Sequence, residues 1–102
     1  MINKLQNTIE LLQTKSTGDV KHDLKLSDYI GCLLDIQEDL EYGAMETFDH
    51  INYKLYTYFG DEYAFVGQPG DFEPYVSPMD MTLDNLYWAI DLALEVLNKK
   101  YN

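Results

Sequence analysis

The sequence contains no arginine, and this absence narrows the functions that the protein can have. All seven basic residues are lysines, set against 18 acidic residues, so the formal net charge at pH 7 is −11. Arginine supplies most bidentate contacts to phosphates and base edges, and a strongly negative protein is repelled by the nucleic-acid backbone. We therefore do not expect a protein that binds nucleic acid directly.

Cysteine and long hydrophobic runs are also scarce. The single cysteine, Cys32, cannot form an intramolecular disulfide, which gives no indication of an oxidising compartment. No apolar run approaches the length of a membrane-spanning helix, and the N-terminus does not resemble a signal peptide. We therefore expect a cytoplasmic protein without membrane contact. A length of 102 residues, 46% of them hydrophobic, predicts a single globular domain over residues 1–102.

Motifs for catalysis, metal binding and cofactor binding are missing as well. No glycine-rich phosphate loop, dinucleotide fingerprint or nucleophile elbow occurs, and Cys32 stands in no nucleophile motif. His50 follows Glu46 by four residues, but a dinuclear carboxylate bundle needs Glu-x-x-His on two helices, and here neither that spacing nor a second copy is present. We therefore predict no enzyme, with no catalytic residue, no metal ligand and no cofactor.

The chain does contain helical periodicity, most clearly from Leu83 to Tyr101. At about 100° per residue, apolar side chains cover all but roughly a third of the circumference of this helix. Thr82 is a suitable N-cap, and two lysines stand in the last turn, where the helix dipole favours cations. We predict that the fold is organised around this helix, with Ile90 and Leu94 near the middle of its apolar arc.

Two further helices are predicted in the first half of the chain. Apolar residues with 3,4,3 spacing indicate a helix from Ile2 to about Gln13, followed by a loop that reaches Lys25. A second helix should begin at Ser27 as its N-cap and end at Gly43 as its C-cap. The core side of this second helix should consist of Leu26, Tyr29, Ile30, Leu33, Leu34, Ile36 and Leu40.

The segment from Ala44 to Phe59 is compatible with two structures. Helical spacing of apolar residues begins at Met45, whereas an alternation typical of a β-strand begins only at Ile51. We prefer the helix because its pattern starts earlier. Residues 60–81 hold three glycines, three prolines and several aromatics, and should form an insert that packs on the helices or binds a partner. The predicted fold class is mainly α, a small bundle of three to four helices with this insert, including at most a short β-hairpin, before the last helix.

The acidic residues are unevenly distributed. Fifteen of them and a single lysine lie between Leu26 and Asn98, whereas residues 1–25 are nearly neutral. In the second helix, carboxylates stand three or four residues apart and near the C-terminus, where like charges and the helix dipole disfavour them. A surface that only keeps the protein soluble needs no such positions. We therefore predict a partner-binding role for Asp35, Glu38, Asp39 and Glu41.

A second group of acids surrounds the only tryptophan, Trp88, in the polar arc of the last helix. Asp84, Asp91 and Glu95 lie four residues before, three after and seven after Trp88, so the four side chains should project on one side. Carboxylates around an indole suit a Lys or Arg of a partner protein. In the alternative, residues 60–81 cover Trp88, and the contact surface is confined to the second helix.

These features support two functional hypotheses. In the first, the chain is a non-enzymatic acidic protein that blocks a basic, nucleic-acid-binding surface of a partner, which would be a nucleic-acid enzyme. Immunity proteins, inhibitors, nucleic-acid mimics and anti-defence proteins of phages or mobile elements work in this way, an analogy of charge and size alone. The alternative is a structural or regulatory helical homo-oligomer whose acidity only maintains solubility. The apolar stripe between Ile2 and Gln13 suggests a homodimer.

Overall fold

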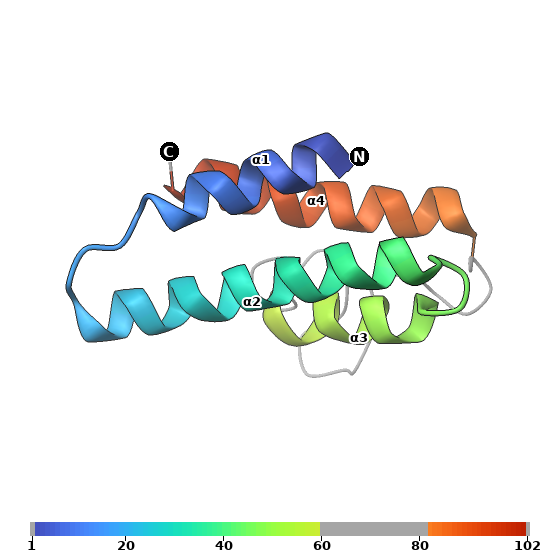
Figure 1. Cartoon of the computed structure of the whole chain (residues 1–102), viewed down its shortest axis with the longest axis horizontal. Coiled ribbons are helices and arrows are strands. Elements are labelled where there is room, and N and C mark those ends of the chain that lie inside the picture. The colour runs from blue at the N-terminus through green and yellow to red at the C-terminus, as the bar shows by residue number, and fades with distance from the viewer. Residues whose placement is uncertain (1, 60–81, 102) are drawn as a thin grey trace.

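The computed structural model of the chain describes residues 2–59 and 82–101, which form four helices. The helices are α1 (Ile2–Gln13), α2 (Val20–Tyr42), α3 (Phe48–Phe59) and α4 (Leu83–Tyr101). Figure 1 shows them in two layers, with α1 and α4 above α2 and α3. Contacts join α1 to α2, α2 to α3, α3 to α4 and α4 to α1, so the helices form a closed ring around a shared core. The predicted mainly α bundle is confirmed, and the described residues include no strand.

The boundaries of α4 agree with those predicted from the sequence. The hydroxyl of Thr82 accepts the N–H of Asn85 at 3.2 Å, and its carbonyl accepts the N–H of Leu86 at 3.0 Å. Thr82 therefore acts as the N-cap. Ile90 and Leu94 are both 0% exposed, as their place in the apolar arc predicts. Of the helices described, none has the length and apolar character needed to cross a membrane.

The start of α2 was predicted wrongly. The helix begins at Val20 with Asp19 as its N-cap, not at Ser27, so the residues up to Lys25 that we expected in a loop are mostly helical. The carboxylate of Asp19 accepts the N–H of Lys21 at 2.9 Å, which satisfies a donor that the helix leaves free. The capping interaction overrides the weak apolar periodicity of this segment.

Asp23 fixes the same helix end from inside the first turn. Its carboxylate accepts the N–H groups of Thr17 and Gly18, both at 2.9 Å, and the hydroxyl of Ser16 at 3.0 Å. The hydrogen bond from the Thr17 N–H, followed by the contact with His22, holds the pKa of Asp23 well below its usual range. The connection between α1 and α2 is thus tied to α2 by local hydrogen bonds.

The third segment is helical from Phe48 to Phe59, and residues 44–47 form turns. The helical interpretation is confirmed over that range, and a strand beginning at Ile51 is wrong. Gly43 ends α2 as predicted: its N–H donates to the carbonyl of Asp39 at 3.0 Å with a φ of 151°. A Cβ there would collide with the carboxylate of Glu46. The insert and hairpin predicted over residues 60–81 lie outside the described residues.

The core draws on all four helices. Two positions differ from the prediction, because Leu34 is 44% exposed while Cys32, which we did not place on the core side, is only 2% exposed. The buried apolar residues are Leu5, Ile9, Leu12, Leu26, Tyr29, Cys32, Leu33, Ile36, Phe48, Ile51, Leu55, Phe59, Leu86, Ala89, Ile90, Ala93, Leu94 and Leu97.

The apolar stripe of α1 is used within the chain. Leu5, Ile9 and Leu12 are at most 1% exposed and belong to the same core as residues of α2 and α4. The stripe from which we predicted a homodimer is therefore not available to a second copy, and only Ile2 remains exposed at its start. The oligomeric state itself stays a prediction.

Candidate functional site

The eight residues predicted for partner binding do not form one surface. α2 and α4 stand diagonally across the ring and touch through side chains such as Tyr29 and Tyr101, whose ring centroids are 6.3 Å apart, so their outward sides face different directions. Four of the carboxylates lie at seams between helices, where each approaches a lysine or histidine of the neighbouring helix. The other four side chains are exposed and have no such contact. The eight residues are Asp35, Glu38, Asp39, Glu41, Asp84, Trp88, Asp91 and Glu95.

Asp35 and Asp39 lie at the seam between α2 and α3. Lys54 Nζ donates to Asp35 Oδ2 at 2.7 Å, and His50 Nδ1 lies 2.5 Å from Asp39 Oδ2. The hydrogen bond to Asp35 raises the pKa of Lys54, because it favours the charged ammonium. The side chain of Asp39 is only 15% exposed. These two carboxylates therefore join α3 to α2 more than they present charge to a partner.

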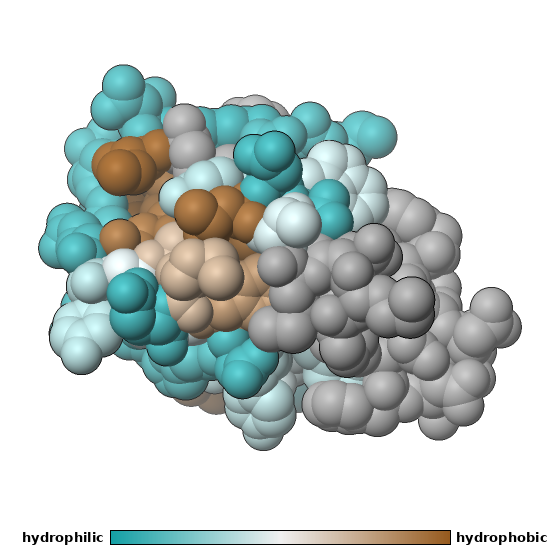
Figure 2. All heavy atoms as spheres, turned by 90° about the vertical axis from the view of Figure 1, so that its right-hand side faces the viewer, coloured by the Kyte–Doolittle hydropathy of each residue, from teal (hydrophilic) through white to brown (hydrophobic). Residues whose placement is uncertain are grey.

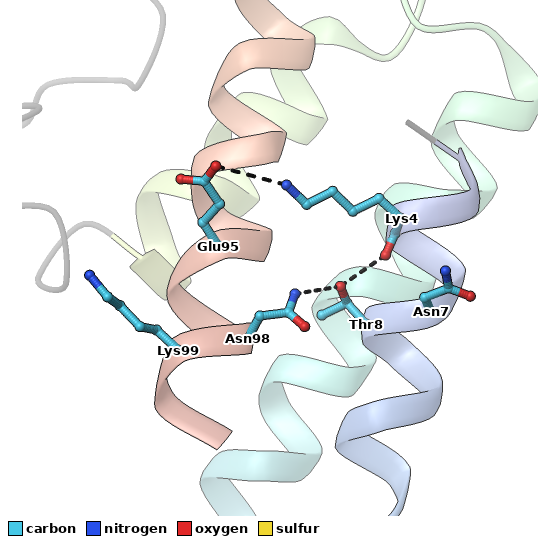
Figure 3. A pocket seen from close by; sticks show the side chains of 6 residues that line it. All are labelled: Lys4, Asn7, Thr8, Glu95, Asn98 and Lys99. Atoms are coloured by element: carbon cyan, nitrogen blue, oxygen red, sulfur yellow. Dashed lines mark hydrogen bonds and ion pairs between the residues drawn. The ribbon is translucent and has the colours of Figure 1, made fainter. Parts of the chain in front are cut away.

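Asp91 and Glu95 lie at the seam between α4 and α1. Lys4 Nζ is 2.5 Å from Asp91 Oδ1 and 3.9 Å from Glu95 Oε1. Figure 3 shows Lys4 extending from α1 toward Glu95. The polar arc of α4, which we expected to face water or a partner, thus contacts α1 along one edge. The lysine offsets part of its negative charge.

A groove of about 850 Å³, lined by residues with polar side chains, runs along the same seam. At its floor, Thr8 is only 1% exposed, donates its hydroxyl to the carbonyl of Lys4 at 2.9 Å and accepts Nδ2 of Asn98 at 2.9 Å. The groove contains cations, amides and one carboxylate, so it does not continue the acidic surface. Its lining residues are Lys4, Asn7, Thr8, Glu95, Asn98 and Lys99.

Glu38, Glu41, Asp84 and Trp88 remain exposed. The three carboxylates have no hydrogen bond or ion pair with another described residue, and Trp88 is 54% exposed. Glu38 and Glu41 stand in the last turns of α2, and Asp84 and Trp88 in the first turns of α4. These two helix ends meet at the same end of the bundle, on the right in Figure 1. The fold therefore gathers members of both predicted groups there.

The same end of the bundle carries an apolar surface that the sequence did not reveal. Ile2, Met45 and Leu83 are 59%, 54% and 36% exposed. A hollow of about 380 Å³, which we call the end hollow, is lined by Ile2, Asn3, Leu40 and Tyr87. Figure 2 looks onto this end and shows hydrophobic residues gathered together with hydrophilic residues around them.

Carboxylates follow the apolar residues of this end directly in the sequence. Three adjacent pairs occur, Leu40–Glu41, Met45–Glu46 and Leu83–Asp84, and each acid is exposed. Each pair comes from a different segment, namely α2, the turn after it and α4. The repeated apolar–acidic step was visible in the sequence, but only the fold brings the three copies to one end.

Among the helices that the structure describes, one layer carries more negative charge than the other. Residues 20–59, which form α2, α3 and the turn between them, hold eight carboxylates and three lysines, a net charge of −5 with histidine neutral. We call them the acidic layer. α1 and α4 hold four carboxylates and three lysines, a net charge of −1, and form the near-neutral layer. The two layers are the lower and upper pairs of helices in Figure 1.

The reactive side chains of the described residues show no activated group. Desolvation raises the pKa of the Cys32 thiol to about 12, so the thiol stays protonated and weakly nucleophilic at neutral pH. Within residues 2–59 and 82–101, no group of three or more His, Cys, Asp or Glu side chains is placed to hold a metal ion. That the protein is not an enzyme stays a prediction.

No protein family, curated protein or solved structure matches this chain.

Proposed function

We propose that the protein is a non-enzymatic binding protein that docks its acidic layer on a basic surface of a partner protein. The observation that carries the proposal is the difference in net charge between the two described layers, −5 in the acidic layer against −1 in the near-neutral layer. Basic surfaces large enough to match such a layer serve chiefly to bind nucleic acid. The partner is accordingly a nucleic-acid enzyme, and binding competes with its substrate.

The position of the free carboxylates supports this proposal. Glu38 and Glu41 are separated by three residues and lie at the C-terminal end of α2, where mutual repulsion and the helix dipole both disfavour them. Asp35 and Asp39 on the same helix are stabilised by Lys54 and His50, whereas Glu38 and Glu41 have no such compensation among the described residues. A positive partner would supply it.

The alternative of a helical homo-oligomer has lost its original basis, since the stripe of α1 is buried within the chain. The exposed apolar end of the bundle is the remaining place for self-association. Light scattering over a range of protein concentrations distinguishes the alternatives: the binding protein stays at one mass, and the oligomer does not.

The proposal is tested by displacement of labelled DNA from a panel of basic nucleic-acid enzymes. We expect the chain to release DNA from at least one of them at an ionic strength of about 0.1 M, and to do so less well at about 1 M, because the Debye length falls from about 10 to about 3 Å. Tight binding of the chain to the DNA itself would contradict the proposal.

The matched variants for this experiment change the same functional group in each layer. Glu38→Gln combined with Glu41→Gln removes two charges from the acidic layer and should weaken displacement. Glu10→Gln removes one charge from an exposed position of α1 in the near-neutral layer and should leave it nearly unchanged. Equal effects per charge would show that only total charge matters and that the acidic layer has no special role.

A further inference from the structure

The end hollow has an apolar wall and is also open to solvent, and the negative charge of the protein explains neither property. Leu40 and Tyr87 are partly buried against the core, while Ile2 at the rim is 59% exposed, so the hollow has an apolar wall that is open to solvent. Met45 and Leu83 extend the apolar surface beyond it at 54% and 36% exposure. Large exposed apolar side chains that gather on one face mark an interaction site more often than a surface without a binding role.

Exposed carboxylates of the adjoining helix ends make this end of the bundle acidic, and we call them its acidic rim. Glu41, Glu46 and Asp84 each follow one of its apolar residues, are exposed, and have no hydrogen bond or ion pair with another described residue. The nearest lysine in sequence to Ile2 is Lys4, whose ammonium is already paired with Asp91 at 2.5 Å. An apolar centre with an unpaired acidic rim is complementary to an apolar side chain flanked by cations.

We infer that the end hollow is the anchoring site for the basic partner: it receives one apolar side chain of a partner segment whose neighbouring Lys or Arg residues pair with Glu41, Glu46 and Asp84. The inference rests on the proposed function and adds to it the position of the contact and the chemistry of the segment. The acidic layer then steers the encounter, and the hollow holds the partner in one orientation.

A second copy of this chain would not supply the cations that the acidic rim requires. Its own end would bring another set of unpaired carboxylates against Glu41, Glu46 and Asp84, and like charges face to face oppose association. A basic segment removes this repulsion, and burial of its apolar side chain adds affinity. Charge complementarity therefore selects a basic partner over self-association.

The test uses two synthetic peptides of the same charge, each with two lysines on either side of a central residue that is leucine in one and alanine in the other. Titration of the whole chain is followed by NMR. We expect the leucine peptide to shift signals of Ile2, Met45 and Leu83, and the alanine peptide to bind about tenfold more weakly, because it buries less apolar surface.

Matched pairs of variants locate the contact. Ile2→Ser with Met45→Ser removes exposed apolar surface at the end hollow and should weaken the leucine peptide about tenfold, without effect on the alanine peptide. Val20→Ser with Leu24→Ser removes comparable side chains, 71% and 62% exposed, from the opposite end of α2 and should change neither. Circular dichroism should show that both variants remain helical, since all four positions are exposed.

The outcomes separate this inference from the function on which it rests. If both peptides bind equally, and Glu38→Gln alone weakens both, the acidic layer binds cations and the anchoring site is wrong. If neither peptide shows binding that decreases with salt, the proposed function fails as well. If the chain self-associates and only Ile2→Ser with Met45→Ser makes it monomeric, the occupant is a second copy, and the inference is overturned.

Discussion

The acidic layer and the near-neutral layer contribute to one core but differ in how they treat surface charge. In the near-neutral layer, Lys4 of α1 approaches both Asp91 and Glu95 of α4, and Thr8 and Asn98 link the same helices through a partly buried hydrogen bond. In the acidic layer, Lys54 approaches Asp35, but exposed carboxylates such as Glu38 have no partner among the described residues.

Stability alone does not account for this difference. Surface ion pairs of the kind made by Lys4 are worth less than about 1 kcal/mol, so pairing is no strict requirement of folding. Leaving acids unpaired at the C-terminal end of α2 is mildly unfavourable, and the chain nonetheless does so in the layer that already has the larger net charge. The pattern suits a surface kept negative for another molecule.

The largest effects are expected where the two layers meet in the core. Leu94 in α4 and Leu55 in α3 are both 0% exposed, so alanine at either should lower the free energy of unfolding by about 2 to 5 kcal/mol in urea denaturation. Leu24→Ala, at a residue 62% exposed, is the control and should change it by no more than about 0.5 kcal/mol. A loss below about 1 kcal/mol at Leu94 or Leu55 would mean that its layer lies outside the common core.

Trp88 tests whether the contact extends from the acidic layer onto α4. Because its indole is 54% exposed, Trp88→Ala should change the free energy of unfolding by less than about 1 kcal/mol, while binding to the enzyme found by DNA displacement should weaken by roughly 2 kcal/mol. Calorimetric titration measures the second quantity. The free protein should show red-shifted fluorescence that acrylamide quenches. A variant that unfolds several kcal/mol more easily would place Trp88 in the core and confine the contact to the acidic layer.

Loss of the partly buried hydrogen bond between Thr8 and Asn98 in the near-neutral layer should have a smaller effect on stability. Thr8→Val removes a hydroxyl that binds both Lys4 and Asn98, and should cost about 1 kcal/mol of unfolding free energy. Thr57→Val is a matched control in α3, because its exposed hydroxyl also donates to a carbonyl one turn earlier, that of Tyr53 at 2.8 Å, without reaching another helix. Equal losses would show that the link between α1 and α4 contributes nothing of its own.

The smallest expected effect is a gain in the free energy of unfolding rather than a loss. Glu38→Gln with Glu41→Gln should raise the free energy of unfolding by a few tenths of a kcal/mol at low salt, because it removes repulsion and an unfavourable helix-dipole interaction. Thermal melts at low and high salt measure the gain, which should vanish as screening increases. Glu10→Gln in α1 should give no such gain, since Glu10 accepts a hydrogen bond from Gln6 at 3.2 Å. A loss of stability in the double variant would remove the argument that these acids are kept for binding.

The sequence by itself determined the elements whose signals are local. The limits of α4 follow from Thr82 at one end and two lysines at the other, and the end of α2 follows from Gly43. Capping and apolar spacing act within about one helical turn, so they can be recognised without the fold. The start of α2 was also encoded locally, in Asp19 and its N–H donors, but the loop-forming residues before it outweighed that signal in our prediction.

The tertiary structure alone decided which charges remain free. Lys4 and Asp91 are 87 positions apart, and Asp35 and Lys54 are 19 apart, so neither pair follows from helical spacing. The concentration of acids was visible in the sequence, yet the sequence did not show that Asp35 and Asp39 would be paired with α3 while Glu38 and Glu41 would not. Such pairs depend on which helices lie side by side, and that is set by burial of the apolar faces.

The same reason applies to the end hollow. Ile2, Leu40 and Tyr87 belong to three helices and are brought together because the start of α1, the end of α2 and the start of α4 reach the same end of the ring. Their composition was available in the sequence, whereas their proximity was not. Local hydrogen bonding determines where each helix begins and ends, but long-range packing determines which side chains share a surface, since contacts between distant residues form only when the core closes.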